Sequence, residues 1–239
     1  MEISLDSALV EGIVRDELAH AREELAHTGP MRALELSQQR HDARLAAAAD
    51  TPTLACKDGC FWCCYFTVDA RPVEVLRIAE FMDRELPATE RARVVTEIKA
   101  NAEILAALDV EERARRNLKC PFLAAGRCTI YSVRPQTCRN YHATDAAGCQ
   151  RSYENPNDDD IDPEFAPLVY QSGGAHVDAF SAAMRETGYD VDAYELNCAL
   201  AAVLDNPLET RQRFEAKRSP FPHLSGTQVW PEFIDSDDE

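Results

Sequence analysis

Cys56-Lys57-Asp58-Gly59-Cys60-Phe61-Trp62-Cys63-Cys64 is the stretch around which the chain is organised, with four cysteines in nine residues. A second set follows at Cys120, Cys128, Cys138 and Cys149, so eight of the nine cysteines fall in two clusters. Cys60 and Cys63 have the two-residue separation that is common among thiolate ligands of a metal. Because eight thiols are enough for two four-sulfur sites, the sequence predicts a metal or iron–sulfur centre bound by cysteine.

Turn-forming residues lie inside both clusters. Asp58-Gly59 favours a tight turn between the first two cysteines, because glycine tolerates positive φ. Gly126 allows a similar turn between Cys120 and Cys128. Each turn would bring two thiols of its cluster together.

Three further positions bear on the chemistry of the thiols. Pro135 fits an early helical position, which places Cys138 in the first turn, where unpaired amides and the helix dipole lower a thiol pKa. His142 follows four residues later and is a weaker candidate ligand, with a surface role as the alternative. Cys198 lies on an apolar stripe, so we expect a buried structural thiol.

Net charge and hydropathy limit the classes of partner. The formal net charge is −17, which argues against nucleic acid or an anionic membrane as the main partner. The chain has no basic n-region at its start and no run of 18 uncharged apolar residues. We therefore expect a cytoplasmic protein, in which clustered cysteines bind metal or perform redox chemistry rather than form disulfides.

Basic residues gather around the second cluster. Asp145 is the only acidic residue between Arg113 and Arg151. The cations of this basic island are Arg113, Arg115, Arg116, Lys119, Arg127, Arg134, Arg139 and Arg151. Nearby cations favour thiolate over thiol, which gives the coincidence a physical reason, and a solvated basic face is the alternative.

Hydrophobic periodicity predicts a mainly α protein built around a cysteine-rich core, with little or no β-structure. Expected helices span 5–27, 31–49, 72–85, 89–117 with a kink near Asp109, 164–171, 175–187, 192–205 and 208–217. Only 65–68 and 129–131 have the composition of short strands. His20, His27 and His41 lie on the first two helices without a neighbouring cysteine, so we expect surface or half-buried side chains.

The helices suggest three segments that form one compact unit. These are an N-terminal helical hairpin at 1–50, a metal-binding core at 51–155, and C-terminal helices with an acidic tail at 156–239. The tail ends in Asp235-Ser-Asp-Asp-Glu239.

The cysteine spacing, together with Cys120-Pro-Phe-Leu, Cys128-Thr-Ile-Tyr, Arg134-Pro135 and Cys138-Arg-x-Tyr141, resembles the YkgJ-like cysteine-cluster (CxxCxxCC) family of zinc- or iron-chelating domains. The resemblance covers about residues 56–150 and departs from many members in its three-residue first gap. It implies a metal-ligand set of Cys56, Cys60, Cys63, Cys64, Cys120, Cys128, Cys138 and Cys149.

Three kinds of function remain open. The first is a metal-binding protein that holds zinc or iron, or a [4Fe–4S] cluster, in a structural or metal-handling role. The second is an enzyme, because the pattern also resembles that of S-adenosylmethionine-dependent flagellin lysine N-methylases with an iron–sulfur cluster. The three-cysteine spacing of radical S-adenosylmethionine enzymes is also present, but the helical flanks do not fit their β/α barrel. The third is a redox or metal-responsive module with a protein partner that its tail or outer helices contact.

Overall fold

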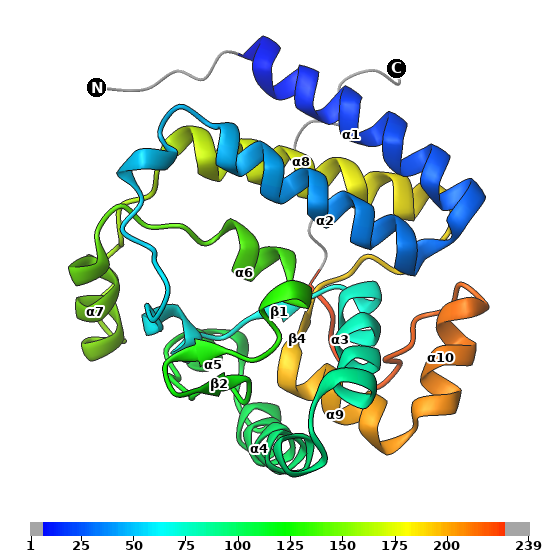
Figure 1. Cartoon of the computed structure of the whole chain (residues 1–239). Helices are drawn as coiled ribbons and strands as arrows, with labels where there is room; N and C mark the ends of the chain where they lie inside the picture. The colour runs from blue at the N-terminus through cyan, green and yellow to red at the C-terminus, as the bar shows by residue number, and fades with distance from the viewer. Residues whose placement is uncertain (1–6, 228–239) are drawn as a thin grey trace.

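Helices account for most of the described structure, which confirms the mainly α prediction (Figure 1). The computed structural model describes residues 7–227, so the predicted acidic end 235–239 lies outside the described residues. The helices are α1 (Ser7–Thr28), α2 (Pro30–Ala47), α3 (Pro72–Glu85), α4 (Ala88–Ala106), α5 (Val110–Ala114), α6 (Gln136–Asn140), α7 (Ala146–Glu154), α8 (Pro167–Glu186), α9 (Leu196–Asp205) and α10 (Pro207–Glu215).

A layer of three long helices, α1, α2 and α8, covers one side of the molecule (Figure 1). Their contact buries charge as well as apolar surface. Glu17 is fully buried and pairs with Arg40 at 2.7 Å, while Arg40 also reaches Glu24 at 2.5 Å. Because a buried carboxylate is tolerated when it is paired, Glu17 lies among the buried apolar residues of α1 without breaking the packing.

Helix α8 is continuous where the sequence predicted two helices separated at Gly173-Gly174. A Cβ atom built on Gly173 would lie 1.8 Å from Asn140 Oδ1 and 3.1 Å from His41 Nε2. Gly173 therefore lets two neighbouring segments approach the helix closely, and the prediction of a break was wrong.

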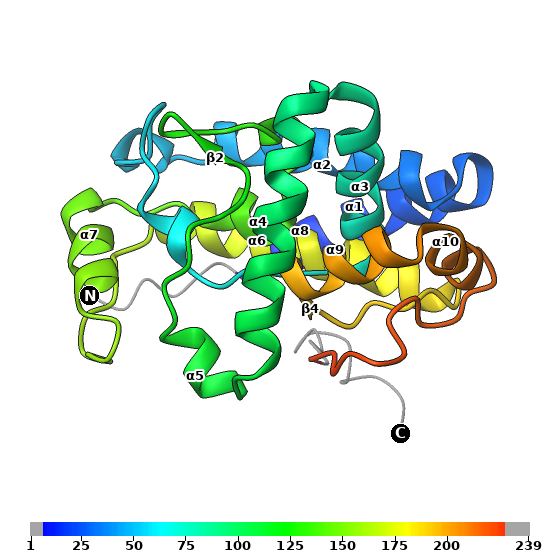
Figure 2. The ribbon, with the colours of Figure 1, turned by 90° about the horizontal axis from the view of Figure 1, so that it is seen from below.

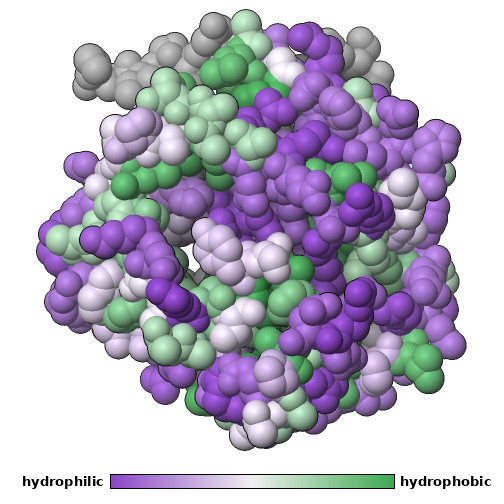
Figure 3. Space-filling model, in the orientation of Figure 1, coloured by the Kyte–Doolittle hydropathy of each residue, from purple (hydrophilic) through white to green (hydrophobic). Residues whose placement is uncertain are grey.

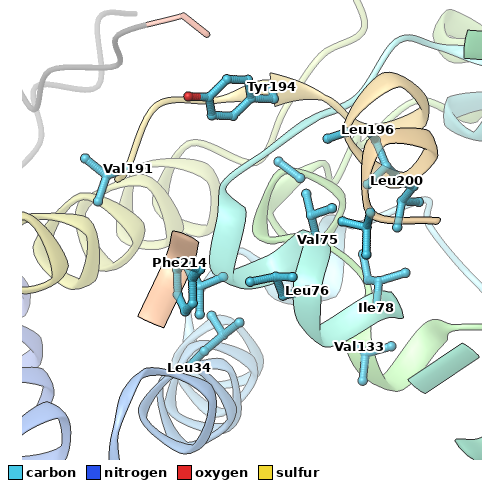
Figure 4. Packing of buried hydrophobic residues seen from close by; sticks show 14 of the residues in the cluster. Leu34, Val75, Leu76, Ile78, Val133, Val191, Tyr194, Leu196, Leu200 and Phe214 are labelled. Carbon is cyan, nitrogen blue, oxygen red and sulfur yellow. The ribbon is translucent and has the colours of Figure 1, made fainter. Parts of the chain in front are cut away.

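The hydrophobic core surrounds α3 (Figure 4). Val75 and Ile78 of α3 are fully buried, and Leu34 of α2 and Leu200 of α9 belong to the same cluster. Residues from all three predicted segments contribute to this cluster, whereas the division into those segments stays a prediction.

The long helix predicted over 89–117 is two separate helices. Helix α4 packs against α9 (Figure 2) and ends at Ala106, and α5 begins after Asp109. The Asp109 side chain accepts a hydrogen bond from the Glu112 amide, and the Glu112 carboxylate accepts one from the Asp109 amide. This reciprocal cap gives α5 its own start, so the chain breaks where a kink was expected.

Two short antiparallel pairs are the strands of the described structure. Strand β1 (Asp69–Ala70) pairs with β4 (Tyr194–Glu195), and β2 (Leu123–Ala124) pairs with β3 (Arg127–Cys128). The strands predicted at 65–68 and 129–131 are absent. The chain there forms the 3-10 turns η2 (Trp62–Tyr65) and η3 (Tyr131–Val133), or irregular structure, and a further 3-10 turn, η1 (Thr51–Thr53), follows α2.

The surface in Figure 3 shows hydrophobic residues in separate patches among hydrophilic ones. Across residues 7–227, no helix has the length and apolar character needed to cross a bilayer.

Candidate metal centre

Main-chain hydrogen bonds hold the two cysteine clusters side by side. The Cys120 amide donates to the Cys64 carbonyl at 2.7 Å, and the Leu118 amide donates to the Tyr65 carbonyl at 3.0 Å. The second cluster therefore enters the fold directly alongside the first, although three helices, α3, α4 and α5, separate them in sequence.

The expected turn in the first cluster is confirmed. Gly59 has φ +83°, and the Cys60 amide donates to the Lys57 carbonyl at 2.9 Å. A left-handed residue is needed at this point, which explains the glycine.

Helix α7 brings Cys149 to the first cluster. The Ala55 amide donates to the Ala143 carbonyl at 2.9 Å, which ties the start of the cluster to the segment before α7. Tyr153 of α7 lies 5.4 Å from the Trp62 ring and 4.8 Å from the Tyr65 ring, measured between centroids. Aromatic contacts therefore dock α7 on η2.

The β2–β3 hairpin arranges Cys120 and Cys128. Cys128 pairs with Leu123 in the hairpin, and the Leu123 amide donates to the Cys120 carbonyl at 3.0 Å. Gly126 has φ +77°, as the predicted turn requires, and Ala125 is also left-handed at φ +50°. The hairpin thus reverses the direction of the chain between Cys120 and Cys128.

The thiols fall into two groups by the effects that they have on one another's pKa. Burial is the largest of the causes that raise the pKa of the Cys149 thiol to about 12, and the thiols of Cys56, Cys63 and Cys60 are the next. Burial also raises the pKa of Cys138 well above its usual range, and the next contributions come from Cys120, Cys63 and Cys128. The first group is therefore Cys56, Cys60 and Cys149, and the second is Cys120, Cys128 and Cys138.

Cys63 raises the pKa of thiols in both groups, Cys56 and Cys149 in the first and Cys120 in the second. A hydrogen bond to the neighbouring Cys64 thiol is the largest cause that raises the pKa of Cys63, and burial adds to it. The adjacent cysteines thus stand side by side at the junction of the two groups.

The lowered thiol pKa expected for Cys138 is wrong. Cys138 does lie early in a helix, but α6 has five residues. Desolvation is the largest effect on this partly buried thiol, so it outweighs the weak dipole of so short a helix and raises the pKa.

The eight clustered thiols lie in one region of the fold, but they do not form a coordination shell. Within residues 7–227, no three His, Cys, Asp or Glu side chains converge closely enough to hold a metal ion. All nine cysteines are free thiols. One side-chain torsion directs each thiol, so the backbone neighbourhood decides which sulfurs can share an ion. Eight soft sulfur donors drawn into one region fit zinc or iron in their chemistry.

The histidines lie beside the centre rather than within a thiol group. Arg134 and Asp42 are the side-chain charges that act on His142, whose pKa is lowered chiefly by burial. His41 is fully buried and lies 5.1 Å from the His176 ring, so the prediction of a surface or half-buried side chain was wrong there. His20 and His27 are exposed as predicted.

Sequence reasoning did not single out Arg134, which it treated as one of eight cations. The charge of this arginine acts on four of the thiols, because it lowers the pKa of Cys56, Cys63, Cys128 and Cys138 against the larger effects that raise it. Its place in the Arg134-Pro135 pair, between two cysteines of one cluster, was the available signal.

A hollow of about 390 Å³ opens beside the centre. Phe61, Tyr65 and Leu123 give it apolar walls, and Arg93 and Lys119 reach it with their cations. Both cations pair with Glu97, at 2.6 Å from Arg93 and 3.9 Å from Lys119, so the hollow carries little uncompensated charge.

Comparison with known proteins identifies the cysteine-bearing segment. Residues 55–161 match the CxxCxxCC family model, described as "Putative zinc- or iron-chelating domain". The match contains all eight clustered cysteines and agrees with the resemblance of this segment to the CxxCxxCC family. Neither the curated proteins nor the solved structures contain a match to the chain.

Proposed function

We propose that this protein binds zinc or iron in two adjacent four-thiolate sites, with a structural or metal-handling role. Cys56, Cys60 and Cys149 would form one site, and Cys120, Cys128 and Cys138 the other. Cys63 and Cys64 would each complete one of the two sites. The observation that carries the proposal is that six thiols from separate segments fall into two groups of three, with the adjacent pair Cys63-Cys64 available to both.

Metal binding would explain why these buried thiols are grouped, since protonated thiols gain little from lying together. Burial raises the pKa of the Cys120 thiol to about 12, so without a metal it stays protonated at neutral pH. A bound cation replaces the protons and stabilises the thiolates, which makes binding release protons. The Phe122 amide already offsets part of the burial effect by a hydrogen bond to the Cys120 sulfur. Such an amide donor suits a thiolate ligand.

A structural role follows from the local fold. The segments that carry the thiols contain only short helices, 3-10 turns and a two-residue hairpin. The hydrophobic cluster reaches them only in part, through residues such as Phe122 and Ile130. Metal ions that link the segments would stabilise this side of the molecule directly, as in other structural thiolate sites.

Three cysteine variants test the proposal, together with the wild-type protein. Metal content is measured by elemental analysis after purification without oxygen or chelator. We expect Cys149→Ser and Cys138→Ser each to lose the metal of one site. Cys198→Ser is the matched control, because Cys198 is also a buried thiol but is coupled to Glu195, Arg113 and Asp69 rather than to another thiol. Full metal retention by both cluster variants would show that the ligand assignment is wrong.

A further inference from the structure

We propose that Arg134 is the buried counter-cation of the thiolate centre, and that its guanidinium donates hydrogen bonds to sulfur when metal is bound. This inference rests on the proposed function and names a residue that controls how firmly the centre holds its metal. Arg134 is not a ligand, because it has no electron pair to give; it positions and neutralises the ligands.

The Arg134 side chain is enclosed. It is 9% exposed, and within the described chain its Nε and Nη1 atoms have no hydrogen-bond partner. The guanidinium carbon lies 3.8 Å from the centre of the Tyr131 ring, and Tyr131 itself is 65% exposed. Tyr131 therefore separates the cation from water on one side.

The backbone of Arg134 is held in place from two directions. Its carbonyl accepts hydrogen bonds from Gln38 Nε2 at 3.4 Å and from Arg139 Nε at 3.1 Å. Pro135 follows and restricts the arginine to the extended conformation that it adopts, with ψ 146°. The side chain thus starts from a fixed point of the segment that joins Cys128 to Cys138.

The charge of Arg134 reaches both thiol groups. It acts on Cys56 of the first group, on Cys128 and Cys138 of the second, and on Cys63 between them. A cation in this position can compensate thiolates of both sites at once.

Most other cations of the basic island have partners elsewhere. Arg116 is exposed, and Arg113 donates to the carbonyls of Leu105 and Leu108. The carboxylate partners of the others are Asp159 for Arg115, Glu97 for Lys119, Asp58 for Arg127, Asp42 for Arg139 and Asp145 for Arg151. In the described part of the island, Arg134 is the buried cation that lacks an acidic partner.

The free-energy cost of burying the Arg134 guanidinium and the cost of burying the thiolate centre then offset each other. A guanidinium that is taken out of water without a partner is strongly destabilising. A site of four thiolates and one divalent ion carries a formal charge of about −2, and its burial is unfavourable for the same reason. Arginine keeps its charge at any accessible pH and offers donors in a planar fork, which suits two neighbouring groups of sulfur acceptors.

The experiment compares metal release from wild type, Arg134→Gln, Arg134→Lys and Arg77→Gln. Arg77→Gln is the matched control, since Arg77 is also largely buried and its Nε has no hydrogen-bond partner within the described residues. Unlike Arg134, Arg77 forms an ion pair with a carboxylate, that of Glu35. Each protein is loaded with zinc or iron(II), its metal content is measured, and release into excess chelator is followed over a series of pH values. Helix content by circular dichroism shows whether each variant is folded.

We expect Arg134→Gln to release metal roughly tenfold faster than wild type or more, with half-release at a higher pH, because thiolates lose a compensating charge. Arg134→Lys should keep the wild-type pH of half-release but release faster, since it retains charge and loses the fork. Arg77→Gln should behave as wild type. Equal release from Arg134→Gln and Arg77→Gln would overturn the inference.

If Arg134→Gln does not fold, the Arg134→Lys variant tests the inference instead. A pH of half-release close to that of wild type would support the counter-cation, and a clear upward shift would overturn it. Failure of the wild-type protein to bind metal would instead reject the proposed function, and the inference with it. The two failures are therefore distinguishable from the wild-type control alone.

Discussion

The amide of Cys120 donates a 2.7 Å hydrogen bond to the carbonyl of Cys64, and this bond joins the two cysteine clusters at the main chain. The bond sets the start of the second cluster beside the adjacent pair Cys63-Cys64. Cys63 couples electrostatically to thiols of both groups. The main-chain contact is thus the structural reason for expecting two neighbouring sites rather than two distant ones.

Removal of the metal should loosen one side of the molecule selectively. We expect chelator to increase amide hydrogen exchange in 55–66 and 118–149, because metal would link segments with little regular structure there. Exchange in α1, α2 and α8 should change much less, since those helices pack on one another. An equal increase throughout, or no increase in the cysteine segments, would argue against a structural role.

Acid should destabilise the protein through His41 and His176. Burial is the main cause that lowers the pKa of each to about 3, against about 6.5 in an unfolded chain. The unfolded state therefore binds more protons, and the stability difference is fully present above pH ~6.5 and is lost as pH falls towards ~3. Each histidine should remove about 1.4 kcal/mol per pH unit within that window.

Urea unfolding of metal-free protein at several pH values measures this dependence. His41→Gln should have a flatter profile below pH ~6 than the wild type. His20→Gln, at an exposed position of α1, is the control and should leave the slope unchanged. A wild-type slope for His41→Gln would contradict the account.

Substitution of the two adjacent glycines of α8 should have opposite effects. Gly173→Ala would place a Cβ 1.8 Å from Asn140 Oδ1, so we expect a loss of about 1–3 kcal/mol of unfolding free energy from overpacking. Gly174→Ala meets nothing within 4 Å and should stabilise the helix by up to ~1 kcal/mol. Thermal or urea denaturation compares the two, and equal effects would show that α8 does not pack as described.

Loss of the buried carboxylate in the helical layer should cost more than loss of an exposed one. Glu17→Ala leaves Arg40 with Glu24 alone and should lower the unfolding free energy by about 3 kcal/mol or more. Glu186→Ala removes an exposed partner of Arg22 and should cost less than ~1 kcal/mol. Denaturation at neutral pH measures both, and similar losses would contradict the buried network.

Helix positions were predictable where helix-starting and helix-ending residues such as proline agree with the hydrophobic periodicity. Pro72 and Pro87 bracket α3, and its expected bounds match the structure. Gly173 misled the prediction because a glycine can serve close packing as well as a break, and only the position of Asn140 distinguishes the two. Similarly, His41 was predicted to be a surface or half-buried residue, because its buried surroundings include His176 from a distant helix.

The composition of the candidate centre was predictable, but its grouping was not. Spacing and resemblance singled out the eight cysteines, and the proposed ligand set remains theirs. The assignment of Cys149 to the first cluster depends on α7 docking against Trp62 and Tyr65, which no local pattern encodes. The role proposed for Arg134 depends in the same way on which other cations find carboxylates.

The most direct test is the metal content and visible spectrum of wild-type protein purified without oxygen or chelator. We predict bound zinc with no colour, at two ions per chain, or iron with broad absorption near ~400 nm and acid-labile sulfide if the sites hold clusters. Protein that contains neither metal, binds neither zinc nor iron(II) on addition, and leaves all nine cysteines open to a thiol reagent after unfolding would contradict the central claim.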